Sequence, residues 1–448
     1  IQYLLVESVL SALVAVYLHT AQQGEDAARR FSFDLWKALT VITAGVVLLV
    51  ELCAPWLARL IAPSYPAEQL TVLSGYLRLL APVLLLLVWI AVFSSLLRAN
   101  KRFIPAEMLS THQSIFVIAL TVSLSARLGV RVLILVFFAY NLWNAGYTAI
   151  LSRPYWTLSR GDPFRNPAVR QMLHMMLPLL AGHSLVYVNQ MVDKALVSSL
   201  GNGAVTALDY AAVLGNLVGT FIVTFASMLF AYTTAHIASG DAESAARLTT
   251  RTTVVLLVAF VPVSLLTCLC AEDIVTIIYA RGAFDAESVR VCAQALRGYA
   301  LMFVPMIFQE VYSRFLYGYR DARRPMINSS VSVVCNIALS VALCPRLGVL
   351  GVAVATSVAS ALCGVLNLLS ARRQHPELHC GVLLHTLPWL AVGSAACGVT
   401  AWLCTARLAG SSPLVRFILT ALLGIAAYAL AAAPLLLRLW RQLRRKPE

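Results

Sequence analysis

The hydrophobic positions of this chain gather into thirteen long runs, which short polar or basic segments separate. A helix needs about 20 mostly apolar residues to cross the hydrocarbon core of a bilayer, which is about 30 Å thick. Backbone groups that face lipid must be hydrogen-bonded within their own segment, so these runs predict helices and no strands. The predicted spans are residues 1 to 20, 35 to 61, 74 to 97, 103 to 126, 131 to 152, 171 to 199, 204 to 238, 252 to 280, 289 to 317, 326 to 344, 348 to 370, 382 to 406 and 413 to 437. The pattern predicts an all-α polytopic membrane protein with 13 transmembrane helices.

The composition and the absence of known motifs narrow the classes of function that this chain can have. Apolar residues make up 60% of the chain and charged residues 12%, whereas a soluble globular domain carries about 25% charged residues. The sequence contains no GxSxG, P-loop or HExxH motif, and its 10 cysteines form no CxxC pair. We therefore expect a transporter rather than an enzyme or an ATP-driven pump, with no catalytic residues, no disulfide framework and no organic cofactor.

Four landmarks occur twice in the same order, at offsets of 217, 218, 220 and 219 residues. The matching pairs are Leu52-Cys53-Ala54 with Leu269-Cys270-Ala271, Ala27-Ala28-Arg29 with Ala245-Ala246-Arg247, Pro105 with Pro325, and Arg127-Leu128-Gly129-Val130 with Arg346-Leu347-Gly348-Val349. Four ordered matches indicate a duplicated unit, which is how many secondary transporters are built. Corresponding spans lie six apart, so the two copies run in the same direction. We expect two parallel six-helix lobes with a cavity between them.

The duplication also predicts where each part begins and ends. We place an N-terminal lobe at residues 1 to 155, a cytoplasmic linker at 156 to 170, a C-terminal lobe at 171 to 373, an appended helix pair at 382 to 437 and a basic tail at 438 to 448. The first copy begins with the counterpart of the second helix of the second copy, and the chain starts with Ile. We expect a fragment that lacks about 50 residues and one helix, so that the intact protein has 14 helices with both ends inside.

Charge predicts the orientation. On one side of the predicted spans lie 22 of the 34 Lys and Arg residues, and on the other side lie 8. The rich side is cytoplasmic by the positive-inside rule, which places the C-terminus inside. The net charge of +14 is then a topology signal with some attraction to anionic membrane lipids. No polar domain is present to bind nucleic acid, so nucleic acid is not an expected partner.

Polar residues inside the spans are the candidates for binding, because such residues usually line a cavity or pathway. Three helices of the second copy carry a carboxylate and other oxygen ligands that suit a hard cation such as sodium. The candidate ligands are Asp193, Asn336, Ser340, Val352 and Thr356. Two alternatives remain open, namely interhelical hydrogen bonding and pairing of Asp193 with Lys194.

Charged residues within the spans suggest a second kind of site. Glu310 and Arg314 form an i, i+4 pair, and Arg78 and Arg297 lie near the starts of equivalent spans. A diphosphate head group in the cavity would need such cationic groups. Glu7 has no cation nearby in sequence and is predicted to face the cavity. The alternatives are a structural ion pair for Glu310 and Arg314 and a protonated or water-exposed position for Glu7.

Several motifs in both copies carry a family resemblance. In the second copy they are Tyr279-Ala-Arg281-Gly282-Ala283-Phe284-Asp285-Ala286-Glu287, Val311-Tyr-Ser-Arg314-Phe-Leu-Tyr317 with Arg324-Pro325, and Gly351-Val-Ala-Val-Ala-Thr356-Ser. In the first copy they are Val6-Glu7-Ser8, Ala54-Pro-Trp-Leu-Ala-Arg59 to Pro63, and Arg78 with Pro82. These motifs resemble the MurJ/MviN lipid II flippases of the multidrug/oligosaccharidyl-lipid/polysaccharide exporter superfamily. The resemblance implies alternating access that carries undecaprenyl-diphosphate-linked peptidoglycan precursor from the inner to the outer leaflet. It also implies the bacterial inner membrane, a central cationic cavity, lipid II as substrate, and cell-wall synthesis proteins as partners.

This chain has the family's residue at some of the family's site positions and a different residue at others. Its sodium ligands match Asp193, Asn336, the carbonyl of Val352 and Thr356, but Ser340 stands where the family has a second carboxylate, which should weaken sodium binding. The family Glu of the second helix corresponds to Glu7.

A family arginine that would contact the diphosphate is replaced. The usual Tyr-Ala-Asp-Arg run reads Tyr210-Ala211-Ala212-Val213 in this chain.

The resemblance further implies that the final helix pair forms a groove for the polyprenyl tail. Lipid II flipping, coupled to a cation or to the membrane potential, is the leading function. The alternatives are flipping of another polyprenyl-linked glycan, cation-coupled drug export and a non-transporting membrane scaffold.

Overall fold

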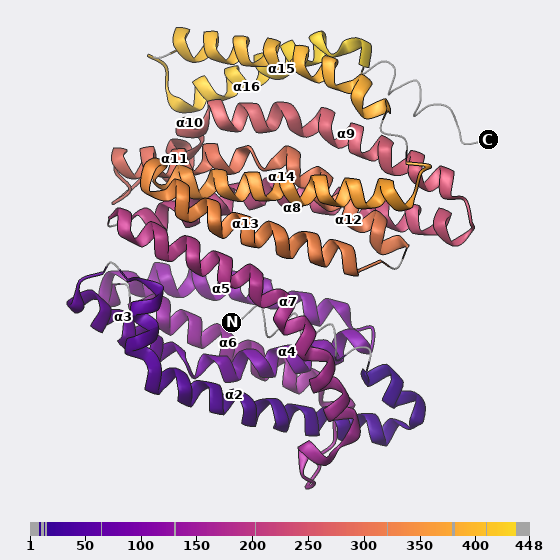
Figure 1. Ribbon diagram of the computed structural model, residues 1–448. Coiled ribbons are helices and arrows are strands. Elements are labelled where there is room, and N and C mark those ends of the chain that lie inside the picture. Colours follow the sequence, from indigo (N-terminus) through magenta and orange to yellow (C-terminus); the bar gives the residue numbers. More distant parts are fainter. Residues whose placement is uncertain are drawn as a thin grey trace. The chain divides into compact units, whose positions relative to one another are not determined.

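The computed structural model describes residues 9, 13, 16 to 63, 65 to 129, 131 to 201, 203 to 319, 321 to 378, 381 to 408 and 410 to 435. Nearly all of these residues are helical, and none of them lies in a strand (Figure 1). The all-α prediction is therefore confirmed. Most of the first predicted span, including Glu7, lies outside the described residues.

By their internal contacts the residues form two units, Ile1–Met191 and Val192–Glu448. The division falls inside one long helix, which begins at Pro167, four residues before the predicted start of the second lobe. The predicted limits of the lobes, linker, helix pair and tail stay predictions.

From Glu25 onward, the described residues of the first unit form five helices and most of a sixth, and residues 16 to 23 before them are also helical. Its helices are α2 (Glu25–Ile61), α3 (Ala67–Leu80), α4 (Val83–Ala99), α5 (Phe103–Leu128), α6 (Arg131–Leu151) and most of α7 (Pro167–Val197), with short 3-10 turns η1 (Arg153–Tyr155) and η2 (Pro163–Arg165). The apolar helix α4 packs against α2, α5 and α6, and α5 packs against α6. Thirteen of the 17 residues of α4 are buried, so this helix forms the centre of the unit.

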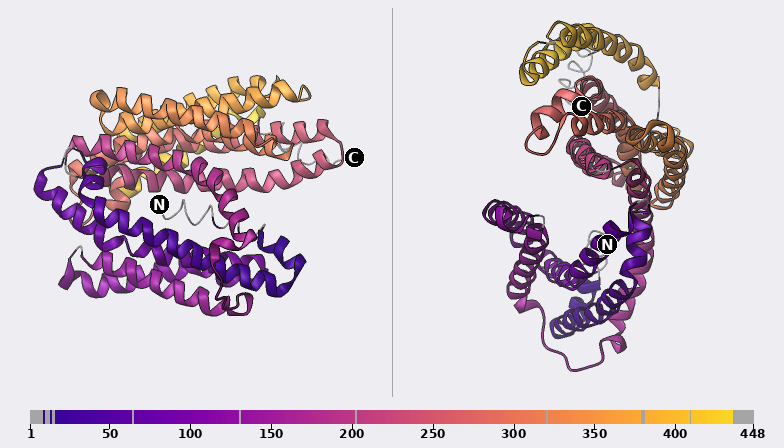
Figure 2. Two further views of the ribbon diagram at one scale, coloured as in Figure 1. Left: turned by 60° about the horizontal axis from the view of Figure 1, so that its bottom comes forward. Right: turned by 90° about the vertical axis from the view of Figure 1, so that its left-hand side faces the viewer.

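The described part of the second unit contains nine helices after the end of α7. They are α8 (Ala204–Ala238), α9 (Ala242–Leu269), α10 (Ala271–Tyr279), α11 (Ala286–Ala300), α12 (Phe303–Gly318), α13 (Arg323–Leu347), α14 (Val349–Gln374), α15 (Gly381–Arg407) and α16 (Pro413–Ala431), with a 3-10 turn η3 (Ser198–Leu200). Helix α12 packs against α8, α9 and α14, while α13 packs along α14. Helices α15 and α16 lie side by side, with α15 against α9 (Figure 2).

Ten helical segments among the described residues are long and apolar enough to cross a membrane. The number becomes 11 if α11 and α12, which meet at 41°, form one broken span. Helices α3 and α4 likewise count as one span, Ala67–Ala99. The chain is therefore a multi-pass membrane protein.

The duplication is visible in how the helices of each unit pack. In the first unit α2 packs on α4, α4 on α6 and α5 on α6, and in the second unit their counterparts α9, α12, α13 and α14 make the same pairs. Each copy also has a span that is broken at an equivalent point, at Ala81-Pro82 and at Leu301-Met302. The repeated motifs of the sequence thus correspond to repeated packing.

Two glycines bring α14 close to its neighbours. A Cβ atom on Gly298 of α11 would lie 2.5 Å from the Cβ of Ala353, and one on Gly364 of α14 would lie 2.9 Å from the Cβ of Phe308 on α12. Side chains cannot approach this closely, so only glycine permits these helix contacts. Both contacts fix the position of α14, which carries part of the polar site.

Candidate functional site

A cluster of buried polar side chains joins α7, α13 and α14 within the second unit. The Ser340 hydroxyl on α13 donates to Asp193 Oδ1 on α7 at 2.8 Å and lies 3.2 Å from Asn336 Oδ1. Asn336 Nδ2 lies 3.5 Å from Thr356 Oγ1 on α14, and Thr356 Oγ1 lies 3.2 Å from the Val352 carbonyl oxygen. The structure therefore brings together all five residues that the sequence suggested as cation ligands.

The sequence of α13 explains why these groups face inward. Its buried face repeats every four residues through Asn328, Ser332, Asn336 and Ser340, which is one side of a helix. Valines such as Val334 and Val341 lie on the exposed side. In a membrane, lipid covers the apolar side, and the polar residues must find partners on neighbouring helices. Helices α7 and α14 supply those partners.

The chemistry of the cluster suits a hard cation. The side chains of Asp193, Asn336 and Ser340 are 7%, 5% and 0% exposed, and they supply carboxylate, amide and hydroxyl oxygens. Thr356 and the Val352 carbonyl add two more oxygens, the ligand type that hard cations prefer. Ser340 contributes a neutral oxygen, so the cluster has one carboxylate among these five ligand residues.

Lys194 lies next to Asp193 in sequence but points to a different partner. Its Nζ atom lies 3.0 Å from both carboxylate oxygens of Asp209 on α8. The alternative in which Lys194 pairs with Asp193 is therefore not what the structure shows. Sequence reasoning missed Asp209, whose only signal was its intramembrane position in the span from 204 to 238.

A second polar network ties α12, α13 and α14 together. Asn367 Nδ2 on α14 donates to Ser313 Oγ on α12 at 2.8 Å, and Asn328 Nδ2 on α13 donates to Asn367 Oδ1 at 2.8 Å. Ser360 Oγ donates to Gln309 Oε1 at 2.9 Å. Asn367 is fully buried, so these bonds satisfy a group that would otherwise be costly inside the protein. The four-residue repeat of α13 was the signal that could have pointed to Asn328.

A cavity of about 370 Å³ lies beside α12, between residues of α8, α13 and α14. Its lining residues with polar side chains include Gln309, Glu310, Ser313, Arg314, Tyr317 and Ser329. Because Gln309 and Ser313 also belong to the Asn367 network, the cavity and that network share a wall.

Glu310 and Arg314 form an ion pair at this cavity. Arg314 Nη1 bonds to the Glu310 carboxylate and lies 3.1 Å from the Glu310 carbonyl oxygen. On its other edge, Arg314 Nε and Nη2 lie 3.2 Å and 3.0 Å from Ser227 Oγ on α8. The side chains of Arg314 and Glu310 are only 18% and 19% exposed. Ser227 is a contact that the sequence did not suggest.

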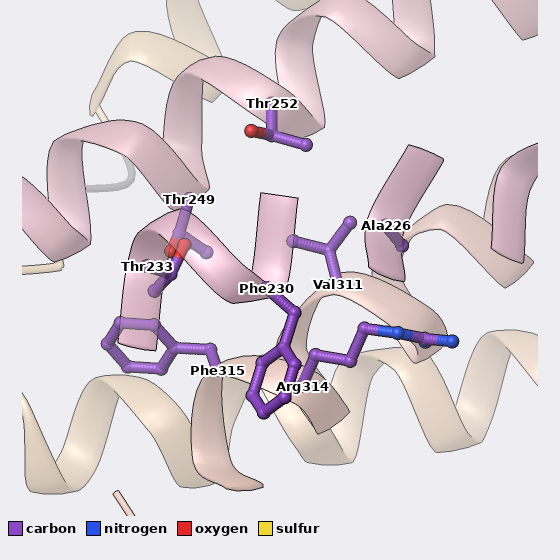
Figure 3. A pocket seen from close by; sticks show the side chains of 8 residues that line it. All are labelled: Ala226, Phe230, Thr233, Thr249, Thr252, Val311, Arg314 and Phe315. Atoms are coloured by element: carbon purple, nitrogen blue, oxygen red, sulfur yellow. The ribbon is translucent and has the colours of Figure 1, made fainter. Parts of the chain in front are cut away.

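The stem of Arg314 also separates the cavity from a small hollow of about 10 Å³. Figure 3 shows the extended Arg314 side chain beside Phe230, with Val311 above it and the hydroxyls of Thr233 and Thr249 further along. Arg314 is thus held along its stem by apolar groups and at its head by Glu310 and Ser227.

The other predicted substrate residues lie elsewhere. In the first unit Arg78 Nε donates to the Glu51 carbonyl oxygen at 3.2 Å. In the second unit Arg297 pairs with Glu272 of α10 at 2.8 Å and is not among the residues that line the cavity beside α12. The Glu7 prediction lies outside the described residues.

The stretch that lacks the family arginine lies at an aromatic cluster. Val213 is exposed on α8. One turn earlier, Tyr210 stacks on Tyr279 with ring centroids 4.7 Å apart, and both rings lie 5.9 Å from Phe284. The Tyr279 to Phe284 segment that carries the family resemblance therefore packs against the altered run.

These features define a class of protein, a multi-pass membrane transporter built from a duplicated helical unit. Solved structures share the fold. One is a "Lipid II flippase MurJ, inward closed conformation", with a TM-score of 0.80 and 17% identity over 99% of this chain and 91% of that one. Another is an inward-facing multidrug resistance MATE family transporter of the MOP superfamily, with a TM-score of 0.69 and 15% identity over 84% of this chain and 88% of that one.

The family itself follows from sequence. The profile of the family described as "Lipid II flippase MurJ" matches residues 1–419, so the chain belongs to the MurJ family, a family of transporters rather than enzymes. Proteins named "Probable lipid II flippase MurJ" from Treponema pallidum and Rhizobium meliloti are 24% and 25% identical over 348 and 370 residues, which cover 74% and 78% of this chain. The chain spans 64% and 67% of the lengths of these two relatives.

Proposed function

We propose that this protein moves lipid II, the undecaprenyl-diphosphate-linked peptidoglycan precursor, from the inner to the outer leaflet of a bacterial cytoplasmic membrane by alternating access. The observation that carries the proposal is the match of residues 1–419 to the lipid II flippase family. The cavity beside α12 supports it, because Arg314 offers a planar guanidinium suited to phosphate oxygens. Moving the anionic head group outward is also favoured by a membrane potential that is negative inside.

Coupling to sodium at the Asp193 cluster is the second part of the proposal. Its support is the chain of hydrogen bonds that links Asp193 through Ser340 and Asn336 to Thr356 and the Val352 carbonyl, across three helices. The neutral Ser340 predicts weaker binding than a site with two carboxylates, because affinity rises with ligand charge. Interhelical hydrogen bonding is the alternative role for the same residues.

One observation favours a related substrate. Val213 is exposed on α8 where the family carries an arginine for the diphosphate, so the head group is recognised by fewer cations. A flippase for another polyprenyl-linked glycan is therefore the second candidate. Such a flippase has the same fold and binds the same polyprenyl tail, but its contacts to the sugar and the diphosphate differ.

The proposed membrane orientation and partner proteins accompany the proposed lipid II flippase function. A cytoplasmic C-terminus is supported by the concentration of basic residues on one side of the spans. Cell-wall synthesis proteins are proposed partners, since flipped lipid II is their substrate.

Complementation tests the proposal. The full-length gene is expressed in a bacterium depleted of its own lipid II flippase, and growth and lipid II on the outer leaflet are measured. We expect growth to be restored. Failure to restore growth despite correct membrane insertion would overturn lipid II as the substrate. In that case, transport of a different polyprenyl-linked glycan by reconstituted vesicles would support the second candidate.

A further inference from the structure

The cavity beside α12 has no net charge in its present arrangement. Among the described residues that line it, Arg314 is the one cation and Glu310 the one carboxylate. If the proposed function holds, this cavity must accept a diphosphate, which carries two or more negative charges. A neutral cavity attracts such a ligand poorly, because transfer of an anion out of water needs a compensating positive charge.

The geometry shows what neutralises the cation. Arg314 Nη1 donates to one Glu310 carboxylate oxygen, Oε2, and to the Glu310 carbonyl oxygen, while Nε and Nη2 donate to Ser227 Oγ. A phosphate that binds the end of the guanidinium in a bidentate way needs Nη1 together with Nη2. The Glu310 carboxylate and a diphosphate therefore compete for Nη1.

The surroundings distinguish this pair from others of the same spacing. The i, i+4 pair of Glu25 and Arg29 has side chains that are 78% and 36% exposed, so water screens it. Glu310 and Arg314 are 19% and 18% exposed and face a cavity in the helical interior. Their attraction is weakly screened, and its loss must be compensated when the pair opens.

We propose that Glu310 is a built-in counter-ion that occupies Arg314 in the empty cavity, so that a diphosphate head group binds by displacing the Glu310 carboxylate from the guanidinium. This inference rests on the proposed function and adds a selectivity device to it. Weak single anions do not displace a carboxylate held one helical turn away, whereas a diphosphate supplies several oxygens at once. The cavity stays neutral and closed to simple anions until its ligand arrives.

Removing the competing charge tests the proposal. Binding of farnesyl diphosphate to the purified full chain in detergent is measured by calorimetry, with farnesol as the ligand that lacks the diphosphate. We expect Glu310→Gln to bind the diphosphate about ten-fold or more tightly than the wild type, since a charge-assisted hydrogen bond no longer has to be broken. Arg314→Gln should lose the binding. The double variant should match Arg314→Gln, because the competition acts through Arg314.

Two controls keep the result specific. Glu25→Gln removes a carboxylate from a pair of the same spacing and should leave the affinity unchanged. Arg314→Lys keeps the charge but not the fork, so it should bind more weakly than the wild type while remaining folded by size-exclusion chromatography.

The outcomes separate this inference from the proposed function. Equal affinity of Glu310→Gln and the wild type, with binding lost in Arg314→Gln, would overturn the counter-ion role and keep Arg314 as the contact. Unchanged affinity in Arg314→Gln would overturn the inference entirely. Lipid II flipping by the wild type in vesicles, measured in parallel, decides the proposed function independently of either result.

Discussion

The α5–α6 pair of the first unit and the α13–α14 pair of the second are copies of one hairpin whose interiors differ at matched positions. With the 219-residue offset of the Arg127 and Arg346 motifs, Asn336 corresponds to Val117, Ser340 to Thr121 and Thr356 to Phe137. Near these positions the first pair, here called the apolar hairpin, has an apolar cluster of Phe116, Leu120, Leu124, Val132, Val136, Phe137 and Tyr140. Its polar contact between the helices lies elsewhere, where His112 Nδ1 is 3.1 Å from Asn144 Oδ1. The second pair, here called the polar hairpin, carries Asn336, Ser340 and Thr356 of the Asp193 cluster. The scaffold itself therefore does not require the polar side chains of Asn336 and Thr356.

This difference separates contacts that stabilise the fold from contacts that the proposed function assigns to binding. An apolar interface between helices in a membrane is held by van der Waals packing. Buried polar groups must be satisfied to avoid a cost, and they add a place for a ligand. Substitutions in the two hairpins should consequently have different signatures.

The largest expected effect is at Asp193 on α7, the carboxylate to which Ser340 of the polar hairpin donates. Asp193→Ala removes the one charged ligand of the cluster, so sodium-dependent stabilisation should vanish and transport should fall at least ten-fold. Sodium at about 100 times its Kd stabilises a protein with one site by about 2.7 kcal/mol, which is readily measured as a change in Tm. Asp209→Asn is the matched control, because its carboxylate serves Lys194. An equal response to sodium in Asp193→Ala and the wild type would remove the cation site.

A second variant should strengthen the polar hairpin. Ser340→Asp places another carboxylate beside Asp193, so we expect about ten-fold tighter sodium binding and lower stability without sodium, because like charges repel. Thermal melting across a sodium titration measures both effects. The equivalent change in the apolar hairpin, Thr121→Asp, should destabilise the protein and confer no response to sodium. A sodium response in Thr121→Asp would show that the two hairpins are interchangeable.

The apolar hairpin should respond only in stability. Val136 is 2% exposed, and Val136→Ala should lower stability by about 2 kcal/mol from lost burial and a small cavity. Chemical denaturation in detergent measures the loss, and the Kd for sodium should stay at the wild-type value. A changed Kd would mean that packing in the first copy controls the site in the second.

The smallest expected effect concerns the N-terminal caps of α2 and α9, which are equivalent helices of the two copies. Helix α2 begins after Gly24 without a side-chain cap, whereas α9 begins after Asp241, whose Oδ1 accepts from the Ser244 backbone N–H at 2.9 Å. Hydrogen bonds from the side chain and backbone of Ser244 lower the pKa of Asp241. The ionised Asp241 carboxylate therefore stabilises the folded protein at pH values above its unfolded-state pKa of about 4. This stabilisation is lost as the pH falls through the lower pKa that Asp241 has in the folded state. Asp241→Ala should lower Tm slightly at pH 7, and this difference should disappear toward pH 3.

Helix positions were predictable because lipid demands long apolar runs, and nearly every described helix overlaps a predicted span. The Asp193 cluster was also predictable, since four-residue spacing places Asn336 with Ser340 and Val352 with Thr356 on single helix faces. The spacing could not identify partners across helices. Lys194 meets Asp209, and Arg314 meets Ser227, because of how α7 and α12 pack against α8. Such pairings depend on tertiary packing, which periodicity does not encode.

The two glycine contacts of α14 have a mechanical consequence. Gly298 and Gly364 leave no gap between α14 and its neighbours α11 and α12, so these helices cannot slide past one another without collision. Helix α14 carries Thr356 of the Asp193 cluster and Cys363 of the cavity wall, and the two close contacts tie it to α11 and α12. A displacement of α14 at the Asp193 cluster would therefore also move the wall of the Arg314 cavity.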